Sequence, residues 1–294
     1  MDAELVHDAR NIVGESLVWD DRRRRLVWVD IIGRSIHAFE PETRRHEIWE
    51  IGRRVTSIGL RADGGAIVGL ERHIAFWDWE GPVEPLVEVE PDMPRNRLNE
   101  GVVGPDGAFW VGTMHNNIAD DDSPLDIPEA TGSIYRYAPD GSLKRMTEDR
   151  FGITNTFVWP DAGTLVTADT LQNALFAYRI EEGRLTGRHT LLAGFERGLP
   201  DGSCLDAEGH VWNARVVGGS CLLRLTPAGV IARIADLPCS WPTSCAFGGP
   251  GLGTLFVTSA RFTMTSDHLA ANPQEGGLFA LQVGASGQQA YRFG

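Results

Sequence analysis

Six positions along the chain carry oxygen-bearing side chains at a regular interval. Each lies four residues before a large or branched residue near the end of an apolar stretch, and successive positions are 41, 43, 56, 46 and 42 residues apart. The six are Glu15, Thr56, Asn99, Asn155, Asp201 and Thr243. Carboxylate, amide and hydroxyl oxygens are the ligands that hard divalent cations prefer. If the fold brings these positions together, they can bind a metal ion.

A β-rich repeat is the element that would bring them together. Each unit contains a short run of aromatic and β-branched residues that follows a turn rich in Asp, Gly or Pro, which is typical of a strand. The runs are Leu26–Val29, Ala66–Gly69, Phe109–Gly112, Thr164–Thr167, His210–Asn213 and Thr254–Val257. A period of about 40 to 50 residues with several strands per unit indicates a β-propeller. We therefore predict an all-β, six-bladed β-propeller that forms a single domain over residues 1–294, with a two-domain β-sandwich as the alternative.

The remaining segments have expected places on this ring. The run Ala3–Ala9 precedes the first repeat, and we expect it to pair with the last blade and close the ring by covering an exposed edge. Segments near 116–131 and 262–275 are inserts, expected as surface loops over one end of the ring. Five tryptophans follow the strand spacing and are expected in the core between blades. They are Trp19, Trp28, Trp110, Trp159 and Trp212.

Equivalent positions in a closed ring lie at one height around its axis. The six side chains should therefore surround one end of the central channel. Two carboxylates, Glu15 and Asp201, repel each other and lose hydration there unless a cation offsets their charge. We expect a central metal site for one divalent ion: calcium, magnesium or manganese suits oxygen ligands, and zinc or iron(II) is an option. The alternative is that polar residues only line a water-filled channel.

Composition excludes several classes of function. The 294 residues include 27 Lys and Arg against 40 Asp and Glu, a net charge of −13, so we expect no nucleic-acid partner. The sequence has no apolar run of about 18 residues, which predicts no membrane span. No apolar stretch marks the first residues as a signal peptide, and the four cysteines form no Cys-x-x-Cys pair. We expect a cytoplasmic protein, a monomer or a homodimer.

Five motifs, in order along the chain, resemble those of the SMP-30/gluconolactonase/regucalcin family. Gly14–Trp19 resembles the family's Gly-Glu-x-Pro-x-Trp opening, and Arg95–Gly101 resembles its Asn-Arg-x-Asn-Asp-Gly motif. Gly152–Asn155 and Leu199–Gly202 are similar to its Ile-[Ser/Thr]-Asn and Pro-Asp-Gly motifs, and Phe247–Ala260 to its closing segment. The resemblance covers nearly the whole chain and implies a six-bladed propeller.

The chain departs from the family pattern at three places. Ser16 and Leu17 replace the small residue and proline that commonly follow the glutamate, and Glu100 stands where the family usually has Asp. The segment Asn213–Arg215 stands where apolar or Trp residues are common. These departures bear on the shape of the loop around Glu100 and on the rim of the pocket.

The resemblance also implies roles for individual residues. Glu15, Asn155 and Asp201 would hold the metal, and Arg97 and Asn99 would contact the substrate. For Arg97, the alternative is a salt bridge to Glu100 or to an acid of the insert.

Two further residues are candidates for binding the substrate. Glu100 follows Asn99 directly, and His115 comes just after the strand of the third blade. For His115, the alternative is an ordinary surface or packing histidine.

The function implied by the resemblance is a metal-dependent hydrolase. It would open a small-molecule sugar aldono-lactone to the aldonic acid in carbohydrate catabolism. We give Asp201 two tasks, metal ligand and general base toward the attacking water; activation of the water by the metal itself is the alternative. Other members are described as calcium-binding proteins, and a few relatives cleave organophosphates. A non-catalytic calcium-binding protein and a phosphotriesterase-like hydrolase are therefore the alternative functions.

Overall fold

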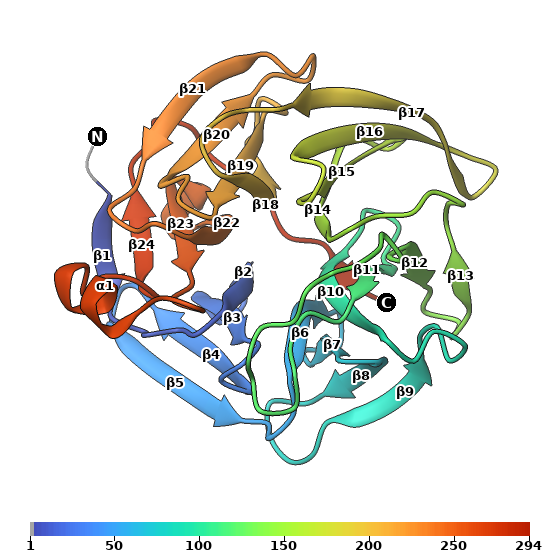
Figure 1. Ribbon diagram of the computed structural model, residues 1–294, viewed down its shortest axis with the longest axis horizontal. Coiled ribbons are helices and arrows are strands. Elements are labelled where there is room, and N and C mark those ends of the chain that lie inside the picture. The colour runs from blue at the N-terminus through green and yellow to red at the C-terminus, as the bar shows by residue number, and fades with distance from the viewer. Residues whose placement is uncertain (1–2) are drawn as a thin grey trace.

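The computed structural model describes residues 3–294, which form six sheets around a central axis (Figure 1). The predicted six-bladed β-propeller is confirmed. Each blade runs from an innermost strand at the channel to an outermost strand at the rim. The innermost strands are β2 (Gly14–Asp20), β6 (Val55–Arg61), β10 (Asn96–Val103), β14 (Thr154–Asp161), β18 (Leu199–Leu205) and β22 (Pro242–Gly248).

The other strands follow in chain order within each blade, except in the last. The second strands are β3 (Arg25–Asp30), β7 (Ala66–Leu70), β11 (Phe109–His115), β15 (Thr164–Asp169), β19 (Val211–Val216) and β23 (Thr254–Ser259). The third strands are β4 (Ser35–Glu40), β8 (His73–Trp77), β12 (Ile134–Tyr137), β16 (Ala174–Glu181), β20 (Cys221–Leu225) and β24 (Leu278–Leu281). The outermost strands are β5 (Arg45–Glu50), β9 (Glu84–Glu88), β13 (Leu143–Arg145), β17 (Arg184–Ala193), β21 (Ile231–Asp236) and β1 (Glu4–His7).

The core lies between the blades. The six runs that the sequence predicts as strands fall on the second strands, and β3, β7, β11 and β19 are buried along their whole length. Trp110 and Trp159 meet edge to face across blades three and four, with ring centroids 5.7 Å apart. Trp212 meets Phe247 in the same way across blades five and six. All five tryptophans predicted for the inter-blade core are buried.

Every innermost strand has a β-bulge or register shift near the same end. The shifts lie between Glu15 and Val18, Val55 and Ser57, Leu98 and Gly101, Asn155 and Val158, Pro200 and Ser203, and Pro242 and Ser244. Two residues that follow ring positions have left-handed backbone, Ser16 with φ 55° and Thr156 with φ 60°. A bulge turns the neighbouring side chains out of the regular alternation of a strand. The β-bulge in each innermost strand therefore sets the direction of the side chain at the ring position.

The two ends of the chain complete the ring. β1 pairs antiparallel with β24, with Glu4 opposite Ala280 and Leu5 opposite Phe279. The first strand thus forms the outer edge of the blade that contains the last innermost strand. At the other terminus, β25 (Arg292–Phe293) pairs in parallel with β6. The segment before β25 crosses the channel behind the ring in the view of Figure 1.

The two inserts differ in structure. Residues 116–131 contain no named strand and reach across to blades one and two, where Asp122 accepts hydrogen bonds from Arg54 (2.6 Å) and Arg34 (2.8 Å). The second insert was expected as a loop but contains α1 (Ser266–Ala271), which begins after the N-cap Thr265. One turn and a half of helix is too short to show a periodic apolar pattern. A 3₁₀ turn, η1 (Pro250–Leu252), follows β22. None of the helices in the described residues is long and apolar enough to cross a membrane.

Removal of β1 should destabilise the fold. A chain that begins at Asn11 leaves the edge of β24 unpaired and removes Leu5 from the core around Phe279. Lost burial of two to three apolar side chains predicts a decrease of about 3 to 6 kcal/mol in the free energy of unfolding. Urea denaturation measures it, with a chain that begins at Ala3 as the control. Equal midpoints for the two truncated proteins would show that β1 does not hold the ring.

Candidate active site

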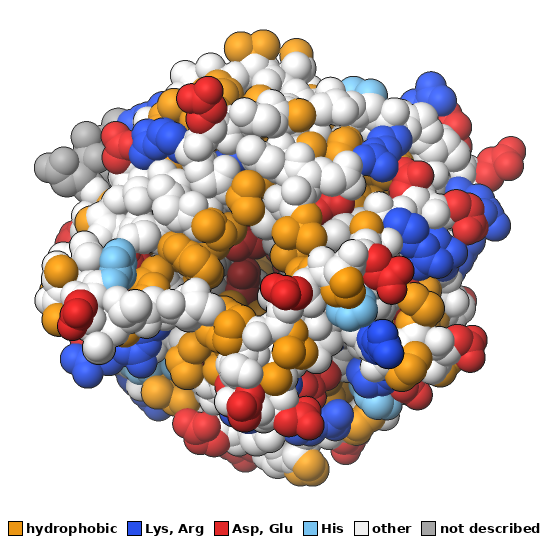
Figure 2. All heavy atoms as spheres, in the orientation of Figure 1, with side chains coloured by type: hydrophobic (Ala, Val, Ile, Leu, Met, Phe, Trp, Pro, Cys, Tyr) orange, Lys and Arg blue, Asp and Glu red, His pale blue; other side chains and the backbone are white. Residues whose placement is uncertain are grey.

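The ring positions meet around one end of the channel. Figure 2 shows a hollow at the centre of the molecule, with acidic side chains at its floor and hydrophobic side chains around its mouth. The carboxyl groups of Glu15, on β2, and Asp201, on β18, share a hydrogen bond across the channel. Asn155, on β14, is buried beside them at 5 % exposure, as is Asp201. Residues distant in the sequence are thus brought together by the closure of the ring.

The side chain of Asn155 is held in one orientation. Its Nδ2 donates to Thr170 Oγ1 at 2.8 Å, and Thr170 Oγ1 in turn donates to the carbonyl oxygen of Pro200, also at 2.8 Å. Its Oδ1 accepts a hydrogen bond from Asn99 Nδ2 at 3.1 Å. Because the amide nitrogen is bound to the turn after β15, the amide oxygen faces the ring. The same hydroxyl ties Asn155 to the residue before Asp201.

Arg97 lies beside Asn99 at the end of β10. Its Nη1 donates to Asn99 Oδ1 at 2.9 Å, and its Nη2 donates to Asn117 Oδ1 at 2.8 Å. The buried Nε has no partner among the described residues. No described carboxylate forms the salt bridge that was the alternative for Arg97, although Glu15 is close enough to favour its charge. A buried donor without a partner indicates a place for an oxygen atom from outside the chain.

Asn117 belongs to this group and was not predicted. Its Oδ1 accepts from Arg97, so it fixes the fork of that side chain. The weak signal in the sequence is its position, two residues after β11 and at the start of the first insert. Nothing in its local pattern separates it from Asn116, whose side chain hydrogen-bonds only within the insert.

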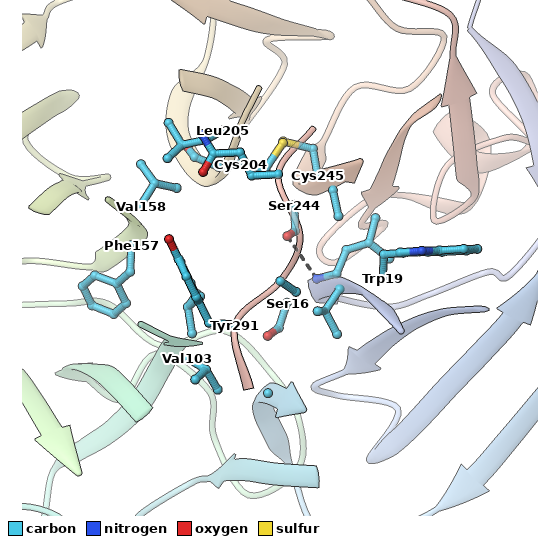
Figure 3. A pocket seen from close by; sticks show the side chains of 18 of the residues that line it. Ser16, Trp19, Val103, Phe157, Val158, Cys204, Leu205, Ser244, Cys245 and Tyr291 are labelled. Carbon is cyan, nitrogen blue, oxygen red and sulfur yellow. Dashed lines mark hydrogen bonds between the residues drawn. The ribbon is translucent and has the colours of Figure 1, made fainter. Parts of the chain in front are cut away.

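Glu100 lies next to a cavity at the end of the channel where the innermost strands finish. Its Oε1 accepts from the backbone N–H of Gly101 at 2.9 Å, and the N–H of Thr156 also donates to its carboxylate. Glu100 lines a cavity of about 140 Å³ at the lower end of the channel, whose other walls are mostly apolar (Figure 3). Burial raises the pKa of Glu100 to about 7. Glu100 thus lies at the bulge next to Asn99, and its charge also contributes to raising the pKa of Glu15 and Asp201.

His115 is not brought together with Arg97. In the pairing of β10 with β11, His115 lies opposite Asn96, and Arg97 lies opposite Met114. Adjacent residues of a strand point to opposite faces of the sheet, and paired residues share a face. His115 therefore shares the face of Asn96, and its buried Nδ1 has no partner among the described residues.

The electrostatics of the ring fit a divalent cation. Burial, followed by repulsion from other carboxylates, raises the pKa of both Glu15 and Asp201 well above the usual range. Asp201 Oδ1 is buried and has no hydrogen-bond partner among the described residues. An acid pair that shares a proton, one free carboxylate oxygen and one amide oxygen turned inward form a set of hard ligands.

Asn155 would have to supply one of the ligands. In residues 3–294 no three or more His, Cys, Asp or Glu side chains form a group able to hold a metal ion. The amide oxygen of Asn155, which faces the ring beside Glu15 and Asp201, would be that ligand. Waters commonly fill the remaining positions around a hard cation.

The pH dependence of stability should report the acid pair. A carboxyl whose pKa rises on folding lowers stability as pH increases from about 4, the unfolded value. In metal-free protein, Asp201→Asn removes one such group, so its stability advantage over the wild type should grow between pH 5 and pH 8. His37 and His46, whose pKa burial lowers to about 4, act oppositely but equally in both proteins. Urea midpoints at each pH measure the difference.

The control for this measurement is Asp161→Asn, an exposed residue at the end of β14. It should give a constant difference from the wild type across the range. A constant difference for Asp201→Asn as well would show that the two carboxyls are not forced together in solution. Saturating divalent cation should reverse the advantage of Asp201→Asn.

The chain belongs to the SMP-30/gluconolactonase family, since residues 13–261 match the model of the SMP-30/gluconolactonase/LRE-like region. An L-arabinolactonase of Azospirillum brasilense is 34 % identical, over 99 % of this chain and 95 % of that protein. A 6-deoxy-6-sulfogluconolactonase of Pseudomonas putida is 32 % identical, over 94 % and 93 %. The crystal structure of a calcium-binding protein, regucalcin, from Agrobacterium tumefaciens matches with a TM-score of 0.89 at 28 % identity, over 99 % of this chain and 96 % of that one. The family resemblance seen in the sequence is confirmed.

Proposed function

We propose that this protein is a metal-dependent lactonase that opens a sugar aldono-lactone to the corresponding aldonic acid. The observation that carries the proposal is the free, buried Oδ1 of Asp201 beside Glu15 and Asn155, with the unpartnered Nε of Arg97 at the same end of the channel. The oxygen atoms of Asp201, Glu15 and Asn155 suit a cation and a water molecule. The Nε of Arg97 suits an oxygen atom of the substrate. Relatives named as lactonases of two different sugar acids support the same reaction class.

Glu15, Asn155 and Asp201 would hold the metal ion. When bound, a divalent ion polarises the lactone carbonyl and lowers the pKa of a neighbouring water. The donor set contains only oxygen atoms, which favours calcium, magnesium or manganese over softer ions, with zinc and iron(II) as further options.

Asp201 is the proposed general base. Its Oδ1 accepts a proton from the water that attacks the carbonyl carbon and returns it to the ring oxygen as the carbon–oxygen bond of the ester breaks. The contact with Glu15 across the channel positions the carboxylate of Asp201. The products are one carboxylic acid and one hydroxyl group.

Arg97 and Asn99 are the proposed substrate contacts. Arg97 Nε is free to donate to a hydroxyl or carbonyl oxygen of the lactone. Both polar atoms of Asn99 already have partners within the chain, so Asn99 orients Arg97 and Asn155 as well as facing the substrate. Glu100 and His115 are further proposed substrate contacts: Glu100 follows Asn99 and its charge acts on Glu15 and Asp201, and the buried Nδ1 of His115 has no partner among the described residues.

Release of acid from lactones tests the proposed activity. Wild-type protein should release acid from hexono- and pentonolactones, and a chelator should abolish this release. Asp201→Asn should lower the rate by about 10³-fold or more, because it removes both a ligand and the base. A pH-indicator assay measures the rate, and Asp161→Asn serves as the control. Chelator-insensitive release, or none across the panel, would reject the proposal.

Arg97→Lys separates substrate binding from metal binding. Lysine keeps the charge but lacks the forked donors, so KM should rise and kcat/KM should fall about 10- to 100-fold. The affinity for the cation, measured by titration calorimetry, should stay close to that of the wild type. An unchanged KM would remove Arg97 from the substrate site.

A calcium-binding protein without enzymatic activity is the second candidate. The structural similarity to a protein described as calcium-binding favours it. The free Nε of Arg97 favours the lactonase, because a site that only buffers a cation needs no buried donor for a second molecule. Cation binding without acid release from any lactone would support this second candidate.

A further inference from the structure

Arg215 is a buried arginine that makes no ion pair. It lies at the end of β19, opposite Pro200, and is 1 % exposed. No carboxylate of the described residues lies within ion-pair distance of its guanidinium, and its hydrogen bonds all go to neutral oxygens. The acceptors are Arg197 O (3.2 Å), Gly198 O (2.7 Å), Phe195 O (3.4 Å), Asn173 Oδ1 (2.6 Å) and Asn213 Oδ1 (3.4 Å).

Burying an unpaired charge costs free energy, which bonds to neutral oxygens offset only in part. Arg215 nevertheless keeps its guanidinium buried and hydrogen-bonded to five oxygen atoms of the chain. The positions of the oxygen atoms that accept hydrogen bonds from the guanidinium therefore indicate the role of Arg215.

Those oxygens belong to two segments that lead to the candidate metal ligands. One is the crossover 194–198, which enters β18 just before Pro200 and Asp201. The other is the turn 170–173 between β15 and β16, whose Asn173 accepts from Arg215 at 2.6 Å and donates to Phe195 O at 3.0 Å. The guanidinium thus joins the turn of blade four to the entry of blade five.

The turn 170–173 in turn holds Asn155. Its Thr170 accepts from Asn155 Nδ2 and donates to Pro200 O, both at 2.8 Å. On the other side of Arg215, Asn213 donates to the carbonyl oxygen of Asp201 at 3.0 Å. Arg215 thus bonds directly to Asn213, and it reaches Thr170 through Asn173, whose backbone N–H donates to Thr170 O at 3.1 Å.

We propose that Arg215 is a positioning residue, which fixes the separation of Asn155 and Asp201 by clamping the 170–173 turn to the 194–198 crossover. The inference rests on the proposed function, because it assumes that these two side chains hold the metal ion. Residues behind metal ligands typically change metal affinity by about 10- to 100-fold when they are replaced. In this proposal Arg215 affects the metal affinity because it fixes the positions of the two ligands, and not because of its charge.

An effect of charge alone would have the opposite sign. A fixed positive charge near the ring repels a cation, so its removal without loss of geometry would tighten cation binding. Arg215→Gln removes the charge and the fork, whereas Arg215→Lys keeps the charge and removes the fork. Positioning predicts weaker binding in both variants, and charge alone predicts tighter binding in Arg215→Gln with little change in Arg215→Lys.

Asn173→Gly provides a milder test that leaves Arg215 in place. Asn173 has a φ of 47°, which glycine adopts without strain. The substitution removes the link between Arg215 and the turn while keeping the buried charge balanced by its other acceptors. The control is Arg224→Gln on β20, an arginine of the same blade that pairs with Asp206 and Glu208.

Calorimetric titration with Mn²⁺ or Ca²⁺ should show affinities about 10-fold or more weaker in Arg215→Gln, Arg215→Lys and Asn173→Gly. Arg224→Gln should match the wild type even where its urea midpoint falls. In metal-free protein, backbone hydrogen exchange should quicken at 154–156 and 198–202 in the three variants only.

Exchange at 154–156 and 198–202 unchanged from the wild type would overturn the proposal, whether or not the protein binds a metal. Cation binding tightened in Arg215→Gln and unaltered in Arg215→Lys would also overturn it in favour of charge. Lactonase activity in the wild type is a separate measurement. Its absence would reject the proposed function and leave the exchange result to decide the role of Arg215.

Discussion

The contact between the carboxyl groups of Glu15 and Asp201 is the interaction on which the site depends. Two buried acids in hydrogen-bond contact are unfavourable unless a proton or a cation lies between them. The two carboxyl groups lie in the central channel of the propeller. There the strands β2 and β18 cannot move apart unless the packing between the blades is broken. A rigid ring thus holds a poorly compensated acid pair, which a hard cation would stabilise.

The β-bulges in the innermost strands set the directions in which the side chains at the site point. A regular strand would send Asn99 and Glu100 to opposite faces of their blade, but the two together oppose the single residue Gly112. The bulge lets Asn99 point to Asn155 while Glu100 accepts the N–H of Thr156 beneath the ring. Neighbouring blades are thereby joined by polar contacts at the height of the site, and by aromatic contacts below it.

Much of the fold could be predicted from the sequence because it follows from repetition. The interval places Glu15, Asn155 and Asp201 among six equivalent positions, and the resemblance to a known family singles out these three as candidate ligands. Glu100 and His115 could not be placed in this way. Their directions depend on the bulge in β10 and on its pairing register with β11, which one residue of shift reverses.

Contacts between distant segments were harder still to foresee. Arg215 acts on oxygens of 194–198 and 170–173, which only the packing of blade four on blade five brings near. Asn117 reaches Arg97 because the first insert folds back over the channel. Neither side chain carries a periodic signal, so the sequence showed Arg215 only as a departure from a familiar pattern.

The pairing of β1 with β24 has a consequence for how the protein is made. Glu4 leaves the ribosome long before its partner Ala280, which follows much later in the chain. Until then the nascent polypeptide carries an unsatisfied strand edge and an open ring, the condition in which stray pairing with other chains is most favoured. The ring can therefore close only after β24 has been synthesised.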